Sequence, residues 1–161
     1  MDPNAPTVAA PTPKHKDTDV KSIFSDAYDN ITNLILNNPG SPAAEMAVVT
    51  PFEGDNMLRF NSLNWALVKF DPTLNLDGMD YLHFDVWAES TRTIKLGLGN
   101  WSSQANTDAL TLNAGWTSFD IPMSVFKSAD LTNIIVSKIF SSNGFAITRL
   151  SLIHISEPTR R

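Results

Sequence analysis

The sequence predicts an all-β protein, an antiparallel β-sandwich of the jelly-roll type. Its apolar residues recur mostly at every second position, the spacing of a strand with one buried face. Leu82, Phe84 and Val86 follow this pattern. Clusters of Asn, Asp, Gly, Pro and Ser separate such runs at intervals of about 8–12 residues, as in sandwiches and barrels. With 161 residues, 42% of them hydrophobic, the chain can bury one core without disulfide bonds.

Ten strands are expected within one domain of about 140 residues, and this number favours a jelly roll. Only two short stretches, residues 27–36 and 123–126, look helical. The expected strands cover residues 20–26, 45–51, 56–61, 64–70, 80–88, 92–99, 107–112, 116–121, 133–140 and 146–155.

The domain is expected to span residues 18–155. Residues 1–17 hold four of the ten prolines and almost no large apolar side chain, which predicts an extended, solvated linker with a few residues added by cloning. Residues 156–161 are expected to form a tail. No signal peptide is visible, so we expect a mature protein or an excised fragment. No apolar run approaches the roughly 20 residues of a membrane span, and membrane insertion is not expected.

The last twelve residues resemble translated transposon and sequencing-adapter DNA. Leu-Ser-Leu-Ile-His-Ile, residues 150–155, is the translation of a transposon mosaic end, and Ser-Glu-Pro-Thr-Arg continues as an adapter would. The resemblance implies a gene from metagenomic DNA whose natural sequence stops near Arg149. His154 and the residues after it therefore support no functional inference. Their β-prone neighbours Leu150–Ile155 are still expected to supply the final strand.

Charge and motif content exclude several function classes. The chain has 12 basic and 17 acidic residues, a net charge of −5, which argues against binding nucleic acid or an anionic membrane. It has no cysteine, so thiol chemistry and cysteine-ligated zinc are excluded. The acids are scattered among turns without a pair suited to glycosidic cleavage. His83 is the one histidine outside the two ends and has no evident serine–acid partnership. We therefore expect no enzymatic activity.

Aromatic and polar side chains on strands and loops suggest a sugar-binding face, because aromatic rings stack on sugars while polar groups bind hydroxyls. Trp101 lies in a polar loop and is the first stacking candidate. If Leu82, Phe84 and Val86 face the core, Trp87 faces outward on the same strand. Trp65 is expected to lie on the other sheet, whose outer face is the second candidate. Trp116 is expected to lie in the core. The residues expected to line one open face are Arg59, His83, Asp85, Trp87, Lys95 and Lys138. The alternative is a solvated surface on which Asp85 pairs with Lys95 or Lys138.

Several segments resemble β-sandwich carbohydrate-binding modules of Bacteroidetes-type polysaccharide-degrading proteins, which have a galactose-binding-like fold. The resemblance rests on the order and spacing of Ala-Ala-Pro-Thr-Pro at 9–13, Asp19-Val20, Phe-Ser-Asp-Ala-Tyr at 24–28, Leu-His-Phe-Asp-Val-Trp at 82–87, Trp116 with Asp120-Ile121-Pro122 and Phe126, and Leu-Thr-Asn-Ile-Ile at 131–135.

The resemblance implies a non-catalytic module that binds a plant or algal polysaccharide of the β-glucan or xylan class. It would be tethered to a glycoside hydrolase, a lyase or a surface glycan-binding protein, and be secreted or placed on the outer membrane of a bacterium. Two alternatives stay open: a spacer sandwich without a ligand, and a fragment of a glycan-degrading enzyme.

The resemblance also implies a structural calcium ion. Modules of this family usually end in a strand with an Asp-Asn pair that helps to bind calcium, whereas Ile153-His154 occupies that place here. Asp26 is the one candidate ligand carried over from the family. Its alternative role is that of a turn or capping aspartate. Because calcium takes six to eight oxygen ligands, a site without the terminal carboxylate should be weak.

Overall fold

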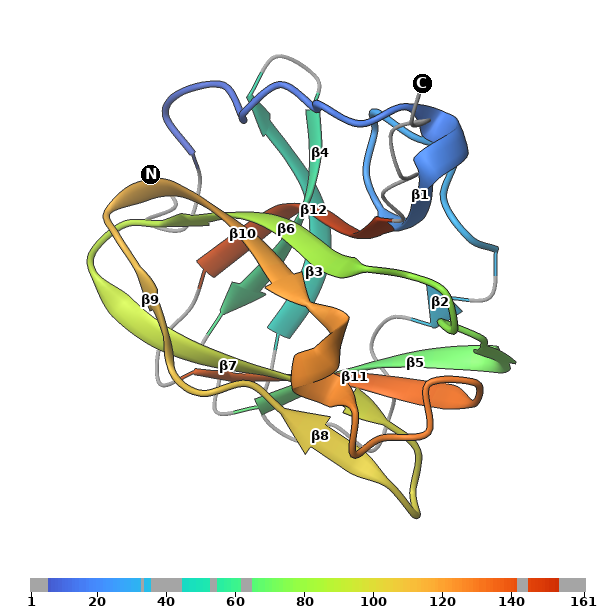
Figure 1. The fold of residues 1–161 in the computed structure, drawn as a ribbon. Coiled ribbons are helices and arrows are strands. Elements are labelled where there is room, and N and C mark those ends of the chain that lie inside the picture. Colours follow the sequence, from blue (N-terminus) through green and yellow to red (C-terminus); the bar gives the residue numbers. More distant parts are fainter. Residues whose placement is uncertain are drawn as a thin grey trace, which may run out of the picture.

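The structure, a computed structural model, describes residues 6–32, 34–35, 45–52, 55–61, 65–141 and 145–153. These residues form two antiparallel sheets packed face to face (Figure 1). The predicted all-β sandwich is confirmed. The described helices are two 3₁₀ turns, η1 (Asp17–Asp19) and η2 (Met123–Phe126). Within the described ranges, no helix is long and apolar enough to cross a membrane.

Sheet A has the order β10-β6-β12-β4-β3, and β1 also pairs with β12. Its middle strand, β12, lies between β6 on one side and both β1 and β4 on the other. The strands are β1 (Val20–Phe24), β3 (Glu45–Phe52), β4 (Asp55–Asn61), β6 (Tyr81–Ala88), β10 (Gly115–Pro122) and β12 (Phe145–Ile153).

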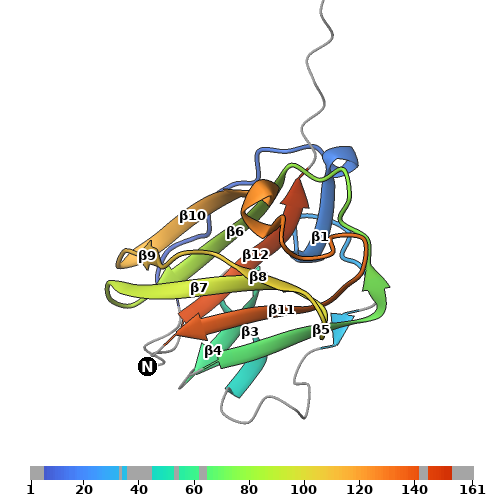
Figure 2. The same ribbon diagram turned by 60° about the horizontal axis from the view of Figure 1, so that its bottom comes forward.

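Sheet B has the order β2-β5-β11-β7-β8, and β9 also pairs with β7. Figure 2 shows its long strands β5, β11 and β7 side by side. The strands are β2 (Leu34–Ile35), β5 (Trp65–Leu74), β7 (Arg92–Gly99), β8 (Gln104–Asn106), β9 (Leu110–Leu112) and β11 (Ile134–Ser141).

The core fills the space between the two sheets, and the period-two pattern decides which side chains enter it. On β6, Leu82, Phe84 and Val86 are fully buried, and on β7 the alternating Ile94 and Leu96 are buried opposite them. The 3₁₀ turn η2, expected at 123–126, adds the buried side chains of Met123 and Phe126. The outer face of each sheet is therefore left to the intervening residues.

Two expected elements differ from those observed. Residues 107–112 were expected as one strand. Instead, two short strands, β8 (Gln104–Asn106) and β9 (Leu110–Leu112), pair one after the other with β7. Thr107 causes the break, because its backbone N–H donates to the carbonyl of Leu96 and its hydroxyl accepts from the Leu96 N–H. The helix-like stretch 27–36 has no helix in its described part. Asn30 folds it into a turn by accepting from the Ser22 hydroxyl and the Ser25 N–H.

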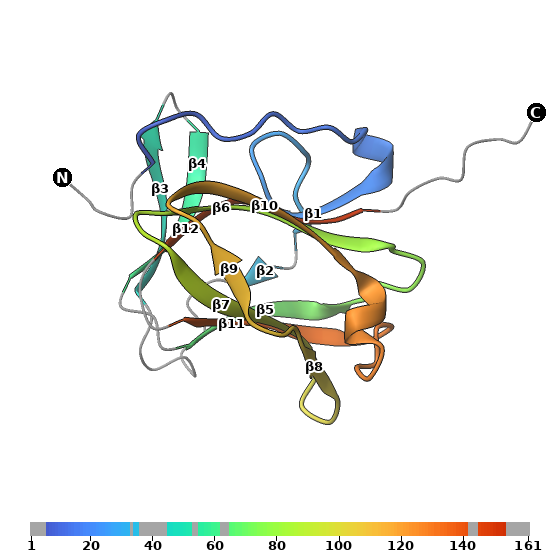
Figure 3. The ribbon, with the colours of Figure 1, turned by 60° about the vertical axis from the view of Figure 1, so that its left-hand side comes forward.

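The N-terminal segment, residues 6–16, has no regular strand or helix, as expected of a linker. It is nevertheless packed onto the domain. Figures 1 and 3 show it running along the outer side of sheet A toward η1, and Pro6 is buried. Much of the segment is exposed, but it also lies against the domain, so the outer face of sheet A is partly covered.

Candidate functional site

The sequence-predicted face is divided between the two sheets. Arg59 lies on β4, and His83, Asp85 and Trp87 lie on β6, all in sheet A, whereas Lys95 on β7 and Lys138 on β11 belong to sheet B. The prediction that these six residues share one sheet is wrong. The chain crosses from one sheet to the other between β6 and β7, and strand periodicity does not reveal such a crossover. Trp65, on β5, lies in the sheet opposite His83, as expected.

The outer face of sheet A carries a polar network on β6 and β10. His83 Nδ1 lies 2.7 Å from Asp120 Oδ1, and His83 Nε2 lies 3.3 Å from Asp85 Oδ2. The Ser118 hydroxyl donates to the other oxygen of Asp85, which is almost completely buried. Burial lowers the pKa of His83, but its hydrogen bonds to Asp85 and Asp120 and the charges of these carboxylates outweigh that effect, so the net pKa is raised above its ordinary value.

This network does not have the geometry of a serine hydrolase. In a Ser-His-acid triad the histidine contacts the serine hydroxyl. Here the Asp85 carboxylate binds both Ser118 and His83, and therefore stands between them. The arrangement stabilises the protonated imidazole between two carboxylates. The alternative pairing of Asp85 with Lys95 or Lys138 fails, because both lysines are on the other sheet.

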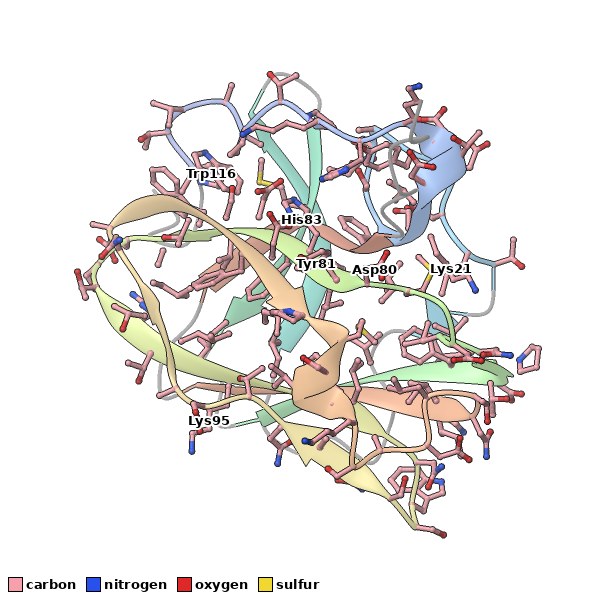
Figure 4. All side chains as sticks on the ribbon, in the orientation of Figure 1. Lys21, Asp80, Tyr81, His83, Lys95 and Trp116 are labelled. Atoms are coloured by element: carbon pink, nitrogen blue, oxygen red, sulfur yellow. The ribbon has the colours of Figure 1, made fainter. Side chains whose placement is uncertain are left out.

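Trp87 does not present its ring to solvent. It is only 9% exposed and packs edge-on against Trp116, with the ring centroids 5.7 Å apart. Trp116 is half-buried on the same outer face, rather than in the core where it was expected. Its indole N–H donates to the carbonyl of Val8 at 3.0 Å. Strand alternation correctly predicted Trp87 on the outer face, whereas the prediction that Trp116 lies in the core is wrong. The N-terminal segment binds Trp116 on that face. Figure 4 shows Trp116 and His83 on the side of the sheet that faces this segment.

The outer face of sheet B is built differently. On β7, Lys95 is exposed and is followed at two-residue spacing by Gly97 and Gly99, on the side opposite the buried Ile94 and Leu96. Figure 4 shows Lys95 projecting away from the sandwich. Asn106 pairs with Gly97, and a Cβ on Gly97 would lie 2.2 Å from the Asn106 Oδ1 atom. The exposed Asn106 amide therefore lies directly over the glycine.

Backbone register extends this face across two more strands. Lys95 pairs with Phe140, which pairs with Trp65. In the next row, Gly97 pairs with Lys138. Cross-strand partners share a face of a sheet, so the positions of Trp65 and Lys138 fall on the same face as Lys95. Their side chains, like that of Arg59 on sheet A, lie outside the described part of the structure.

Trp101 stands at the end of this face, in the loop between β7 and β8. It is 62% exposed, which confirms the expected exposed loop tryptophan. The loop is held by Asn100, whose Oδ1 accepts from the N–H groups of Ser102 and Ser103 and whose Nδ2 donates to the Asn133 carbonyl. The ring is thus presented from a fixed backbone.

Asn106 is the residue that sequence reasoning missed. It follows the loop on a three-residue strand, too short to give a pattern of its own. The available signal was on its partner strand. Gly97 and Gly99 occupy outward positions of β7, in alternation with the buried Leu96 and Leu98. Glycine in a strand marks a place where another group approaches closely.

Asp26, the candidate calcium ligand, uses both carboxylate oxygens within the protein. Oδ2 accepts from the backbone N–H of Asn56 at 2.6 Å, and Oδ1 accepts from its side-chain amide at 3.1 Å. Among the described residues, no three His, Cys, Asp or Glu side chains are grouped so that they could hold a metal ion. Asp26 therefore fastens the turn after β1 to the start of β4, and calcium binding stays a prediction.

The fold is that of known carbohydrate-binding modules. The family 11 module of a cellulosomal cellulase of Clostridium thermocellum aligns with a TM-score of 0.58 at 14% identity, over 88% of this chain and 98% of that one. The family 30 module of another cellulosomal cellulase of the same organism aligns with a TM-score of 0.59 at 16% identity, over 87% and 99%. A family 29 module gives 0.55 at 12% identity, over 83% and 86%.

The same fold also matches part of a longer chain. An agarase aligns with a TM-score of 0.57 at 10% identity, over 86% of this chain and 25% of that one. These likenesses are in fold. No protein-family model matches the sequence, and no curated protein matches it either.

Proposed function

We propose that this protein is a non-catalytic carbohydrate-binding module that holds a polysaccharide along the outer face of sheet B. The observation that carries the proposal is Trp101, whose ring is 62% exposed on a loop fixed by Asn100. A large exposed aromatic side chain is unfavourable in water unless it has a use, and stacking on a pyranose ring is such a use. The neighbouring structures, named as carbohydrate-binding modules, support the same function.

The chemistry of the face suits a chain of sugars. Lys95 and Asn106 are exposed beside it and can bond to hydroxyls. Gly97 and Gly99 are buried under Asn106 and the β7–β8 loop, so their lack of a side chain lets these polar groups lie close to the sheet, where they can bond to a ligand. The positions of Trp65 and Lys138 add a second aromatic and a second cation at the far strands. We propose these residues as the binding set and exclude Trp87, which is buried.

The ligand we propose is a neutral plant or algal polysaccharide of the β-glucan or xylan class. Such chains offer flat pyranose faces for stacking and hydroxyls for hydrogen bonds, and they need no dense cationic patch. Because an outer sheet face is shallow, we expect weak binding, on the order of micromolar to millimolar, or roughly −4 to −8 kcal/mol.

We further propose that the module is natively tethered to a carbohydrate-active enzyme or surface glycan-binding protein and acts outside the bacterial cell. The agarase match supports tethering, since a domain of this fold there makes up about a quarter of a longer chain. Polysaccharides are too large to enter a cell, so a module that binds them has its use outside.

Affinity-gel electrophoresis on a panel of soluble polysaccharides tests the proposal. We expect retardation by at least one β-glucan or xylan, a matching change in tryptophan fluorescence, and no release of reducing sugar. Absence of both retardation and fluorescence change across the panel would favour a ligand-free spacer. Release of oligosaccharides would identify an enzyme fragment instead.

A further inference from the structure

The N-terminal segment, residues 6–16, is held on sheet A by side-chain donors that bind its backbone carbonyls. The Trp116 indole N–H donates to the Val8 carbonyl at 3.0 Å, and the Tyr28 hydroxyl donates to the His15 carbonyl at 2.9 Å. These bonds lie near the two ends of the segment. The Val8 side chain is 53% exposed although its carbonyl is bound, so this contact holds the backbone rather than the valine. Val8 and His15 lie at bends, and residues 9–14 between them run without a turn or bend.

The prolines of the segment suit this mode of attachment. Pro6 is buried, and Pro11 and Pro13 are half-buried. Proline fixes φ near the extended polyproline conformation and has no N–H that would need a partner, while its carbonyl stays free to accept. Proteins that recognise proline-rich chains use aromatic-lined grooves in the same way.

A pocket lies between the segment and the sheet. Its volume is about 120 Å³, and residues from both sides line it. Pro11, Pro13 and His15 contribute from the segment, whereas Tyr28 and His83 contribute from the domain. The rings of His15 and His83 meet edge to face, with their centroids 6.5 Å apart. The domain therefore presents aromatic side chains along the path of the segment, from Trp116 and His83 on sheet A to Tyr28 in the turn after β1.

We propose that the outer face of sheet A is a receptor groove for an extended proline-containing chain, and that residues 6–16 of this protein occupy it in cis. A short tether keeps the segment at an effective concentration of about millimolar, so even a weak groove stays filled. The two outer faces then have different occupants: sheet A binds the chain's own N-terminal segment, and sheet B is left open to a glycan.

The first test removes the two donors from the full-length chain while keeping an aromatic ring at each position. In Trp116→Phe and Tyr28→Phe, each lost hydrogen bond should raise hydrogen exchange and protease cleavage within residues 6–16 about two- to tenfold. Trp101→Phe is the matched control and should leave the segment as protected as in the parent. If residues 6–16 are equally protected in the parent and in the double variant Trp116→Phe/Tyr28→Phe, the proposal is overturned. Tyr28→Phe alone decides the test if Trp116→Phe does not fold.

The second test asks whether the groove accepts the segment as a separate molecule. Pro11→Gly with Pro13→Gly in the full-length chain should loosen the attached segment. A fluorescein-labelled peptide of residues 6–16 should then bind saturably, with fluorescence anisotropy as the readout, and adding Trp116→Phe should weaken this binding two- to tenfold. No binding at millimolar peptide, or binding that ignores Trp116→Phe, would overturn the proposal. Glycan retardation should be the same in the parent, the proline variants and Trp116→Phe, because it depends on the other sheet.

Discussion

Trp87 and Trp101 show that the surroundings of a tryptophan decide whether its ring is exposed and can bind a ligand. Trp87 lies near the end of β6 and Trp101 just after the end of β7, the next strand along the chain, and both were expected to face away from the core. Trp101 stands on a tight loop with nothing packed over it and is 62% exposed, whereas Trp87 is covered and packs against Trp116. Among the described residues, the buried indole N–H of Trp87 has no hydrogen-bond partner. Only the exposed ring can stack on a ligand without rearrangement.

Trp101→Ala should weaken glycan binding about five- to a hundredfold. We take a stacking contribution of about 1–3 kcal/mol by analogy with aromatic stacking on bases, at 1.4 kcal/mol per tenfold in affinity. Stability should change by less than about 0.5 kcal/mol, because the side chain is exposed. Titration of the folded variant with the best polysaccharide of the panel measures the effect, and Trp116→Phe on the other sheet is the control. Unchanged affinity in Trp101→Ala would contradict the stacking role.

His83 should make stability depend on pH near neutrality. Its pKa is raised in the folded protein because bonds to Asp85 and Asp120 outweigh the effect of burial. The folded state therefore favours the protonated imidazole. The contribution of His83 to the free energy of unfolding is complete below its unfolded-state pKa of about 6.5. It is lost as the pH rises through the higher pKa of His83 in the folded state. Urea unfolding at several pH values between about 5.5 and 8.5 should show the decline in the parent and a flatter profile in His83→Gln. Parallel profiles would show that the bridge does not contribute.

At the scale of elements, the β7–β8 hairpin connects the fold to the proposed site. Gly97 and Gly99 let β8 and its preceding loop fold closely over β7. This loop carries Trp101, and β8 carries Asn106. A Cβ on Gly99 would clash with the backbone of Ser103 and Gln104, whereas the clash of one on Gly97 would be with the end of the Asn106 side chain. A side chain at Gly99 would therefore displace backbone, whereas one at Gly97 would displace a side-chain amide.

Gly99→Ala should destabilise the protein more than Gly97→Ala. At Gly99 the backbone of the loop must shift, and such overpacking costs about 1–3 kcal/mol. At Gly97 the Asn106 amide can rotate away at lower cost. Urea denaturation of both variants measures the difference, and Gly99→Ala should also weaken glycan binding because the loop carries Trp101. An equal or smaller loss of stability in Gly99→Ala would show that the hairpin adjusts freely.

Strand β12 makes the C-terminal residues part of the fold. Leu150–Ile153 pair with β1 on one side and with β6 on the other. Deleting residues 150–161 leaves β1 without its ladder and uncovers core residues such as Ile23 and Phe24, at about 1.5–3 kcal/mol for each side chain exposed. We expect a loss of several kcal/mol and poor solubility. Deletion of residues 156–161 alone, the expected tail, is the control and should leave the melting temperature unchanged. A full truncation that melts like the parent would contradict the role of this strand.

At the scale of the whole molecule, any ligand of the folded state adds stability in proportion to RT ln(1 + [L]/Kd). Calcium should therefore raise the melting temperature if Asp26 belongs to a metal site. Because Asp26 already binds Asn56, we expect only a modest rise at millimolar calcium, and none in Asp26→Asn. Calorimetry with and without a chelator, together with elemental analysis, measures this. No shift and no bound ion in the parent would leave Asp26 with its bonds to Asn56 alone.

The sequence by itself determined the fold class and most strands, because period-two burial and turn residues are local properties. Leu82, Phe84 and Val86 are buried, and Trp101 is exposed, as their neighbours in the chain indicate. The tertiary structure decided which strands share a sheet and what covers each face. Lys95 and Lys138 lie on the other sheet from His83. The sequence did not predict this, because crossovers between sheets leave no local signature. Trp87 packs against Trp116, and the Trp116 indole N–H binds the carbonyl of Val8, a contact that forms only when the whole chain is folded.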